Sequence, residues 1–422
     1  MKKIAIIGSG ISGLSAAWLL SQEHSVTVFE KESWYGGHAH TIDVPFGDTT
    51  VSPDTGFMVF NLQGYPELSK FLNHLDVESK KSDMSFSVSL NDGEFEFSSS
   101  NIFAEWRHMF SINFLSFLLE IPRFNKYALR QLQGGIEEDT TIDDFLTKHN
   151  FSQNFRQQYL YPMASLIWSA PPRIVATFPL EMILNFLNNH NLLRLMPGLH
   201  WRSIVGGSRE YVNKIVRDIE SRGGSLHLNT PATSVSRGEG TVFVVTKNGT
   251  HEFDAVVLAT HSDISLQLLS DATEQEKKIL GAFTYQSNRV VVHSDTSFMP
   301  KRRSAWAAWN FCDIKAGEND EEVSLTYNMN ILNGIPEEYP LFVTINPARL
   351  PQSDCIHGDF NYSHPMHSAD VSRAQKLLPS LQGENNTYFC GAYSGYGFHE
   401  DGLQSGIDVA ESLNVIVPWN NK

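Results

Sequence analysis

The first thirty residues contain three glycines at a spacing that strongly limits the fold. Gly8, Gly10 and Gly13 form G-x-G-x-x-G, after the apolar run IAII and within GSGISGLSAAWLL. The pattern predicts a buried strand over 3–7, a tight turn, and a helix over 12–20, followed by a second strand in SVTVFE. This order is typical of α/β folds that bind a dinucleotide.

Each part of this unit has a mechanical reason. Gly8 permits the turn, Gly10 lets the backbone approach a diphosphate, and Gly13 lets the helix and the strand pack closely. The helix N-terminus stabilises phosphate charge, and Glu30 at the end of SVTVFE can accept hydrogen bonds from ribose hydroxyls. A leader peptide is the alternative interpretation, but the glycines interrupt the apolar helix that a leader requires.

Further features distinguish among nucleotides. Glu30 disfavours NADP, because its carboxylate would repel a 2′-phosphate. Two glycine-rich stretches favour FAD over NAD. WYGGHAHT at 34–41 lets a second loop approach the diphosphate. Near the C-terminus, the sequence predicts a strand over 388–390 and a helix that begins near Asp401, whose start can stabilise negative charge on a flavin ring.

The stretches GSGISGLSAAWLL, FEKESWYGGHAHT and the glycine-rich C-terminal helix resemble the flavin-containing amine oxidase superfamily. Further blocks are similar to its branch of predicted bacterial NAD/FAD-binding oxidoreductases, which also resembles the N-terminal half of plant cyclopropane fatty-acid synthases. These blocks are DTGFMVFN at 54–61, SDMSFSVSL at 82–90, YPMASLIWSAP at 161–171, IVGGSREYV at 204–212, MPKRRSAWAAWN at 299–310 and GYGFHEDGLQSG at 395–406. The resemblance covers nearly the whole chain. It implies an α/β fold with a Rossmann-type, glutathione-reductase-like FAD-binding domain and an inserted α+β substrate domain.

Matched position by position, the resemblance also implies a set of cofactor-binding residues. They are Gly8, Gly10, Ser12, Gly13, Glu30, Lys31, Gly37, His38, Gly56, Phe57, Val235, Gly391, Glu400, Asp401, Gly402 and Leu403. The first glycines are expected at the diphosphate and Lys31 by the adenosine ribose. Val235 is expected to pair with adenine through its backbone, and residues 401–403 to lie by the isoalloxazine.

The chain departs from the family pattern in two places. Amine oxidases of this type usually carry Gly-Gly-Arg where this chain has Gly-Gly-His, ending in His38. One diphosphate counter-charge is therefore weaker or supplied elsewhere. Many members also carry a lysine that holds a water near the flavin, but the aligned strand QSNRVVVH has Asn288 and Arg289 instead. This difference disfavours an efficient oxygen-reducing oxidase.

The FAD-binding domain is expected to be discontinuous. Segments 1–62, 200–262 and 383–420 should build it, and 63–199 and 263–382 should build the substrate domain. Residues 63–198 are predicted to be mainly helical. Within 285–346, the stretches RVVVH, AWAAWN, VSLTYNM and LFVTIN have the alternation and β-branched content of strands.

The candidate catalytic residues are His399, His364 and Phe398. Flavin chemistry needs few protein groups, because the cofactor performs the hard step. His399 precedes the flavin-facing helix, where a structural or FAD-binding role is the alternative. His364 lies in NYSHPMH, where His-Pro suggests a fixed turn, and Phe398 aligns with an aromatic that lines the substrate face. We expect no metal site, because no carboxylate or cysteine set surrounds His38.

Segment 102–132 carries Phe103, Trp106, Phe110, Phe114, Phe117 and Ile121 at helical spacing, flanked by Arg107, Arg123, Lys126 and Arg130. Two interpretations stay open. The segment is either a helix pair packed in the core or an amphipathic surface that contacts a membrane and admits an acyl chain.

Composition restricts the remaining possibilities. The net charge of -15 over 422 residues disfavours nucleic acid as a partner. Three widely spaced cysteines indicate a reducing compartment, so we expect a cytoplasmic protein, with peripheral contact at the inner membrane face as the alternative.

The expected activity is FAD-dependent oxidation, desaturation or isomerisation of an apolar small molecule, a fatty-acyl group or lipid, by hydride transfer. A flavin amine oxidase and a non-catalytic flavin-binding partner in a lipid pathway are the alternatives. The sequence leaves the exact substrate, the electron acceptor and the oligomeric state open.

Overall fold

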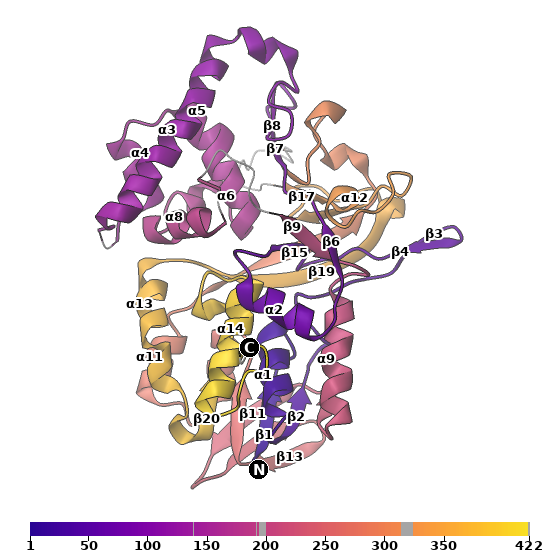
Figure 1. Cartoon of the computed structure of the whole chain (residues 1–422), viewed down its shortest axis with the longest axis vertical. Helices are drawn as coiled ribbons and strands as arrows, with labels where there is room; N and C mark the ends of the chain where they lie inside the picture. Colours follow the sequence, from indigo (N-terminus) through magenta and orange to yellow (C-terminus); the bar gives the residue numbers. More distant parts are fainter. Residues whose placement is uncertain (138, 191, 194–199, 314–323, 421–422) are drawn as a thin grey trace.

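The computed structural model describes residues 1–137, 139–190, 192–193, 200–313 and 324–420. Parts of the expected substrate domain at 138, 191, 194–199 and 314–323 lie outside these residues. The architecture is mixed α/β, as predicted. A parallel sheet and its helices form one end of the molecule, a second sheet crosses its middle, and a helical unit forms the other end (Figure 1).

The parallel sheet assembles strands from chain segments that lie far apart in the sequence. In spatial order they are β10 (Ser225–His227), β2 (Ser25–Phe29), β1 (Lys3–Ile7), β14 (Ala255–Leu258) and β20 (Thr387–Phe389). The central strand β1 pairs in parallel with β2 and β14. The predicted β–turn–α–β unit is confirmed, with the helix α1 over Ile11–Leu20.

Two helices meet over this sheet at close range. Helix α14 (His399–Ser412) begins two residues earlier than predicted and packs along α1. A Cβ atom on Gly402 would lie 2.7 Å from Ile11 Cγ2, and one on Gly406 would lie 2.2 Å from Ser15 Oγ. Only glycine allows this approach, which brings the starts of both helices together.

The second sheet is larger and mostly antiparallel. Its strands in spatial order are β19 (Ile356–Pro365), β15 (Tyr285–His293), β18 (Phe342–Ile345), β17 (Ser324–Asn328), β16 (Trp309–Cys312), β7 (Phe86–Leu90) and β8 (Phe95–Ser98). The four strands predicted within 285–346 are present. The expected turn at His364 is wrong, because this residue lies in β19 and pairs with Gln286 of β15.

The segment 63–198 is less helical than predicted, because β7 and β8 extend the second sheet. Its helices are α2 (Pro66–His74), α3 (Ile112–Gly134), α4 (Ile142–Lys148), α5 (Gln153–Phe155), α6 (Tyr161–Trp168), α7 (Pro172–Val175) and α8 (Leu180–Asn189). Helices α3 to α8 form the helical unit around a buried aromatic cluster. Local signals set their ends; in α4, Thr141 and Asp144 cap the first turn reciprocally.

Smaller elements complete the fold. The remaining strands are β3 (Val44–Phe46), β4 (Thr49–Val51), β5 (Phe60–Asn61), β6 (Ser79–Lys81), β9 (Trp201–Ile204), β11 (Ala232–Arg237), β12 (Val242–Thr246) and β13 (Gly249–Phe253). The remaining α-helices are α9 (Arg209–Ser221), α10 (Ser262–Leu268), α11 (Glu274–Leu280), α12 (Met329–Leu332) and α13 (Ala369–Leu377). Within the described residues, no helix combines the length and the apolar character that crossing a membrane requires.

Candidate active site

The first glycine loop leaves open space beside the start of α1. Gly8 has φ +101°, which favours glycine, and its Cβ would lie 2.7 Å from Ala259 O of the chain after β14. A Cβ on Gly13 would lie 2.0 Å from Gly8 O. Around Gly10, by contrast, a Cβ would meet no protein atom within 4 Å. Two glycines therefore serve packing, while Gly10 borders space that the protein does not fill.

A second loop lies directly on the first. Gly36 N donates to Ser9 O at 2.9 Å, and a Cβ on Gly37 would lie 3.1 Å from Gly10 Cα. A third segment follows: Phe57 N donates to His38 O at 2.8 Å. A Cβ on Gly56 would lie 2.4 Å from the same His38 oxygen. The structure thus brings the predicted residues of all three loops together.

Glu30 is buried at the end of β2 and holds the glycine loop. Its Oε2 accepts hydrogen bonds from Ser9 N (2.8 Å) and Ser9 Oγ (2.6 Å), and its Oε1 accepts one from Glu32 N. Oε1 has a further lone pair for a ribose hydroxyl. The Lys31 side chain is exposed and pairs with Glu32.

Other predicted cofactor residues occupy structural positions. Ser12 and Leu403 are buried where α1 meets α14, and Gly391 N donates to Ser405 Oγ at 2.9 Å. Val235 is buried in β11, and its carbonyl oxygen already accepts hydrogen bonds from Ser270 N and Oγ. Pairing of Val235 with adenine remains a prediction, and its carbonyl is already engaged.

His38 and His364 face one another, with ring centroids 5.3 Å apart. Burial holds the pKa of His38 well below its usual range and lowers that of His364 to about 4. His38 is therefore neutral near pH 7, and it does not replace the charge of the arginine usual in the family. Its Nε2 atom is buried without a hydrogen-bond partner.

Asn288 fixes the orientation and the tautomer of His364. Asn288 Oδ1 accepts hydrogen bonds from Gln286 and Asn346, so the Asn288 amide nitrogen is its donor end. That nitrogen donates to His364 Nδ1 at 2.9 Å. The neutral His364 ring then carries its proton on Nε2. Asn288, one of the two residues in the strand that the resemblance aligns with the family's lysine, thus belongs to a neutral network.

His399 is held on two sides. Its ring stacks on Phe57 at 3.8 Å between centroids, and its Nε2 is 2.7 Å from Tyr211 Oη. Burial lowers the pKa of His399 to about 3, so the ring is neutral. These contacts position the start of α14 against the third loop. A catalytic role for His399 remains a prediction.

The two carboxylates that follow His399 cap neighbouring backbone. Asp401 accepts from Phe398 N (2.8 Å) and Tyr396 N (3.1 Å), and Glu400 accepts from the amides of Glu67 and Leu68 at the start of α2. Burial raises the pKa of Asp401 to about 6 and that of Glu400 to about 7.

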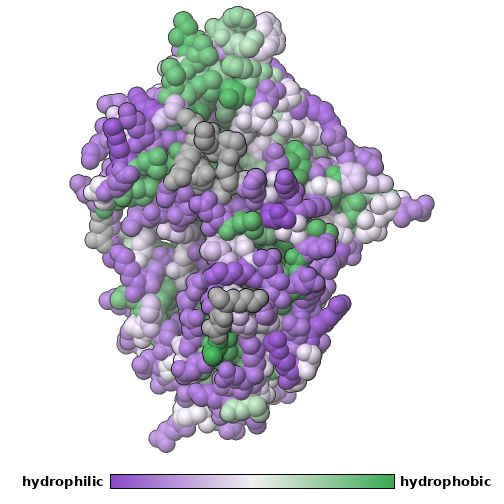
Figure 2. Space-filling model, in the orientation of Figure 1, coloured by the Kyte–Doolittle hydropathy of each residue, from purple (hydrophilic) through white to green (hydrophobic). Residues whose placement is uncertain are grey.

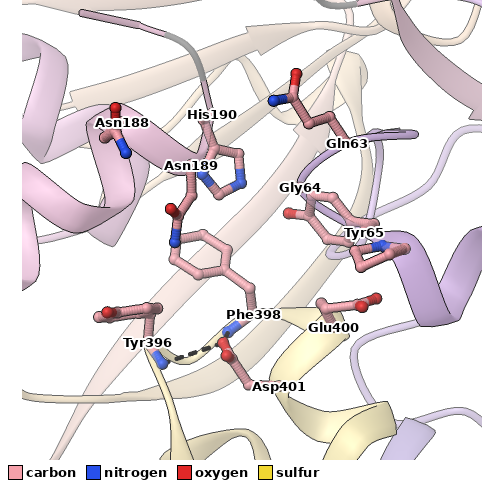
Figure 3. Close-up of a pocket in the computed structure, with 11 residues that line it drawn as sticks. Gln63, Gly64, Tyr65, Asn188, Asn189, His190, Tyr396, Phe398, Glu400 and Asp401 are labelled. Carbon is pink, nitrogen blue, oxygen red and sulfur yellow. Dashed lines mark hydrogen bonds between the residues drawn. The ribbon is translucent and has the colours of Figure 1, made fainter.

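A cavity of about 390 Å³ lies above these carboxylates, between α14, the entry to α2 and the end of α8 (Figure 3). Its lining residues are Gln63, Gly64, Tyr65, Pro66, Asn188, Asn189, His190, Tyr396, Phe398, Glu400 and Asp401. Phe398 lines this cavity, and its ring stacks with Phe186; its place on a substrate face remains a prediction. Among the described residues, the lining contains no lysine or arginine.

Sequence reasoning missed His190, which stands at this cavity opposite Phe398 (Figure 3). Its Nδ1 lies 3.0 Å from Phe186 O, so Nδ1 carries the proton and donates, while the buried Nε2 has no partner. Burial lowers the pKa of His190 to about 4. His190 thus carries an unpartnered acceptor and is itself a lining residue of the cavity. Its position at the end of an amphipathic helix gave no signal.

Sequence reasoning also missed that Asp54 holds several chain segments together. Its buried Oδ1 accepts from Thr41 Oγ1 (2.7 Å), Ser208 N (2.8 Å) and Ser208 Oγ (2.7 Å). Three distant segments are joined at this carboxylate. The block DTGFMVFN contained it, but a sequence block does not show its partners.

Comparison with known proteins places these features in a family. The family profile described as flavin containing amine oxidoreductase matches residues 11–345. No match was found among curated proteins. Solved structures with the same fold include a CLA-producing fatty acid isomerase from P. acnes, at 14% identity and TM-score 0.65 over 97% of this chain and 98% of the other.

Two amine oxidases have the same fold at similarly low sequence identity. Cyclohexylamine oxidase from Brevibacterium oxydans is 15% identical, with TM-score 0.67 over 98% of this chain and 99% of its own. Putrescine oxidase in complex with putrescine is 13% identical, with the same TM-score and coverage.

Proposed function

We propose that this chain, which belongs to the family of flavin-containing amine oxidoreductases and is therefore an FAD-dependent oxidoreductase, acts on a fatty-acyl chain carried in an uncharged ester. The observation that carries the proposal is the cavity beside Phe398, whose lining, among the residues that the structure describes, is aromatic in part and contains no cationic side chain. An uncharged ester needs no counter-charge, whereas a free carboxylate buried there would lack one.

The residues present fit FAD. The space beside Gly10 adjoins the start of α1, and no side chain caps that helix start. The free backbone N–H groups of an uncapped helix N-terminus can bind a phosphate group. His38 Nε2 is buried without a hydrogen-bond partner, and Glu30 Oε1 has a lone pair that a ribose hydroxyl can use. When bound, FAD supplies the acceptor for a hydride from the substrate.

The protein groups at the cavity would orient the substrate and receive a proton. Phe398 and Tyr396 present rings that can hold an apolar chain and exclude water. Desaturation removes a hydride from one carbon and a proton from its neighbour, so a proton acceptor is needed in addition to the flavin. His190 Nε2 is an unpartnered acceptor in the cavity wall, and we assign it this role.

A second candidate substrate is an amine. Glu400 and Asp401 stand beneath the rings of Tyr65 and Tyr396, and carboxylates beside aromatic faces suit an ammonium group. Both carboxylates are already bonded to backbone amides and have raised pKa values, which weakens their attraction for a cation.

Anaerobic mixing of the FAD-loaded protein with acyl lipids and with amines distinguishes the two candidate substrate classes. We expect an acyl phospholipid to bleach the visible flavin band, and a free fatty acid to do so more weakly because its carboxylate has no counter-charge. Bleaching by simple amines and not by acyl lipids would overturn the proposal in favour of amine oxidation.

The variant His190→Gln tests the proton acceptor. Flavin reduction by the productive substrate should slow about a hundredfold, within the usual range for loss of a general base. FAD content should stay at one per chain, because His190 lies outside the glycine loops. Unchanged reduction kinetics would exclude His190 from the reaction.

A further inference from the structure

The end of the helical unit exposes large apolar side chains that nothing in the described structure covers. Trp106 is 63% exposed, Phe110 75%, Ile112 83% and Leu119 72%; Met109 and Leu115 are exposed as well. We call these six residues the α3 patch. Figure 2 shows hydrophobic side chains gathered at this extremity of the molecule, over the start of α3. An exposed apolar cluster of this kind marks an interaction surface.

The patch is built on a firm base. Phe114 and Phe117 project from the opposite side of α3, are buried, and form a cluster with Phe97 of β8. Ser111 caps the helix by accepting from Phe114 N. Ile112, Leu115 and Leu119 therefore stand on a helix whose inner face is packed, and Trp106, Met109 and Phe110 lie on the 3₁₀ helix just before it. Exposure of the α3 patch is a property of the fold rather than of a frayed end.

Charge continues the same surface of α3. Ile112, Leu115 and Leu119 are followed at helical spacing by Lys126 and Arg130, both exposed. The apolar half and the basic half thus share one face, with about 20 Å between Ile112 and Lys126 at 1.5 Å per residue. A surface in contact with the whole helix would meet both halves.

Acidic groups in this segment are withdrawn from solvent. Glu105 is buried and paired with Arg302, and Glu120 pairs with Arg123. The exposed charged residues within 101–130 are all cations: Arg107, Lys126 and Arg130. At the rim, on the β7–β8 turn, Asp92 pairs with Lys301, and Glu94 is exposed. A cationic surface on a chain of net charge -15 indicates an anionic partner.

We propose that α3 docks on a bilayer that contains anionic phospholipid, with the α3 patch inserted at the headgroup boundary and Lys126 and Arg130 against the lipid phosphates. A projecting apolar end suits insertion between lipids, whereas a helical peptide would require a groove. A second copy of this chain fits less well, because a symmetric contact through this surface would bring Arg107, Lys126 and Arg130 of both copies into one interface. The proposal rests on the proposed function, in which membrane lipid supplies the esterified chain.

The same helical unit carries both the docking surface and the cavity wall. Phe117 contacts Tyr159, Tyr159 contacts Phe155, and Phe155 belongs to the buried cluster against which Phe398 packs. Docking through α3 would therefore fix the cavity relative to the lipid surface.

Vesicle flotation of the FAD-loaded protein tests the proposal without turnover. Wild type should float with vesicles of phosphatidylglycerol and phosphatidylcholine at low salt, and less at high salt or with phosphatidylcholine alone. Trp106→Ala/Phe110→Ala should weaken binding about tenfold or more. Lys126→Gln/Arg130→Gln should do so by about fivefold per charge. FAD content and melting temperature verify that the variants fold.

Matched controls come from other exposed positions. Leu350→Ala/Ile416→Ala removes two exposed apolar side chains, and Lys278→Gln/Lys376→Gln removes two exposed cations; both should float like wild type. Failure of wild type to float would overturn the proposal, as would an α3-patch variant that floats equally well. Self-association that Trp106→Ala/Phe110→Ala abolishes, without vesicle binding, would assign the surface to a second copy. None of these results depends on whether acyl lipids bleach the flavin.

Discussion

Helices α1 and α3 are both rich in apolar residues, but the protein surrounds them differently. All ten residues of α1 are buried, enclosed by the parallel sheet, α9 and α14. Helix α3 has 23 residues, and only Phe114, Phe117, Phe124, Asn125 and Ala128 are buried. The apolar side chains of α1 pack inside the fold, whereas many apolar side chains of α3 are exposed to solvent. The contrast separates a region built to hold a cofactor from a surface available to a partner.

The largest effect is expected where α1 enters the fold. In Gly13→Ala the new Cβ would lie 2.0 Å from Gly8 O and 3.0 Å from Ala259 Cβ, and neither neighbour is a flexible side chain that could move aside. We expect a loss of more than about 4 kcal/mol of unfolding free energy, or no soluble protein. Chemical denaturation measures it. A stable variant that retains FAD would show that α1 is less tightly enclosed than described.

A matched pair of leucines sharpens the comparison. Leu14 of α1 is 0% exposed, and Leu119 of α3 is 72% exposed. Leu14→Ala should cost about 2–5 kcal/mol of unfolding free energy, and Leu119→Ala less than about 0.5 kcal/mol. Urea unfolding of both variants measures the difference. Equal losses would mean that α3 is covered in solution.

The smallest effect concerns Glu400, at the junction of the two regions. Burial raises its pKa from 4.5 to about 7, so the folded state binds the proton more tightly than the unfolded state. The contribution of Glu400 to stability is therefore full below about pH 4.5 and is lost as pH rises through about 7. Glu400→Gln should reduce this fall by about 2 kcal/mol, allowing for its partial exposure.

Unfolding free energies of wild type and Glu400→Gln, measured from pH 4 to 8, test this pH dependence. The difference between the two proteins isolates Glu400 from the other carboxyl groups. Parallel curves would show that the carboxylate is solvated in the folded protein.

The glycine spacing was a strong guide to the cofactor-binding half. It predicted β1, α1 and β2 to within a residue, because a tight turn between a buried strand and a helix needs glycines at fixed positions along the chain. The start of α14, to within two residues, and the strands β15, β16, β17 and β18 of the second sheet also followed from local alternation and glycine content. The family profile agrees with the resemblance over residues 11–345.

Contacts between distant segments could not be predicted. Strand β7 joins the second sheet by pairing with β16, more than 200 positions later, and nothing in its own sequence names that partner. Glu400 was expected at the cofactor, but its carboxylate caps α2. The helical spacing of apolar residues in segment 102–132 was clear. Whether these residues lie in the core or on the surface depended on which distant elements pack against the segment.

The most direct test of the account is FAD binding by Gly10→Ala. Gly10 has φ −63°, and its Cβ would meet no protein atom, so the FAD-free variant should melt like FAD-free wild type. The new methyl group would occupy the space assigned to the diphosphate. We predict that FAD affinity falls roughly tenfold to a hundredfold in a fluorescence titration. Unchanged affinity in a normally folded variant would contradict the claim that this loop holds the cofactor.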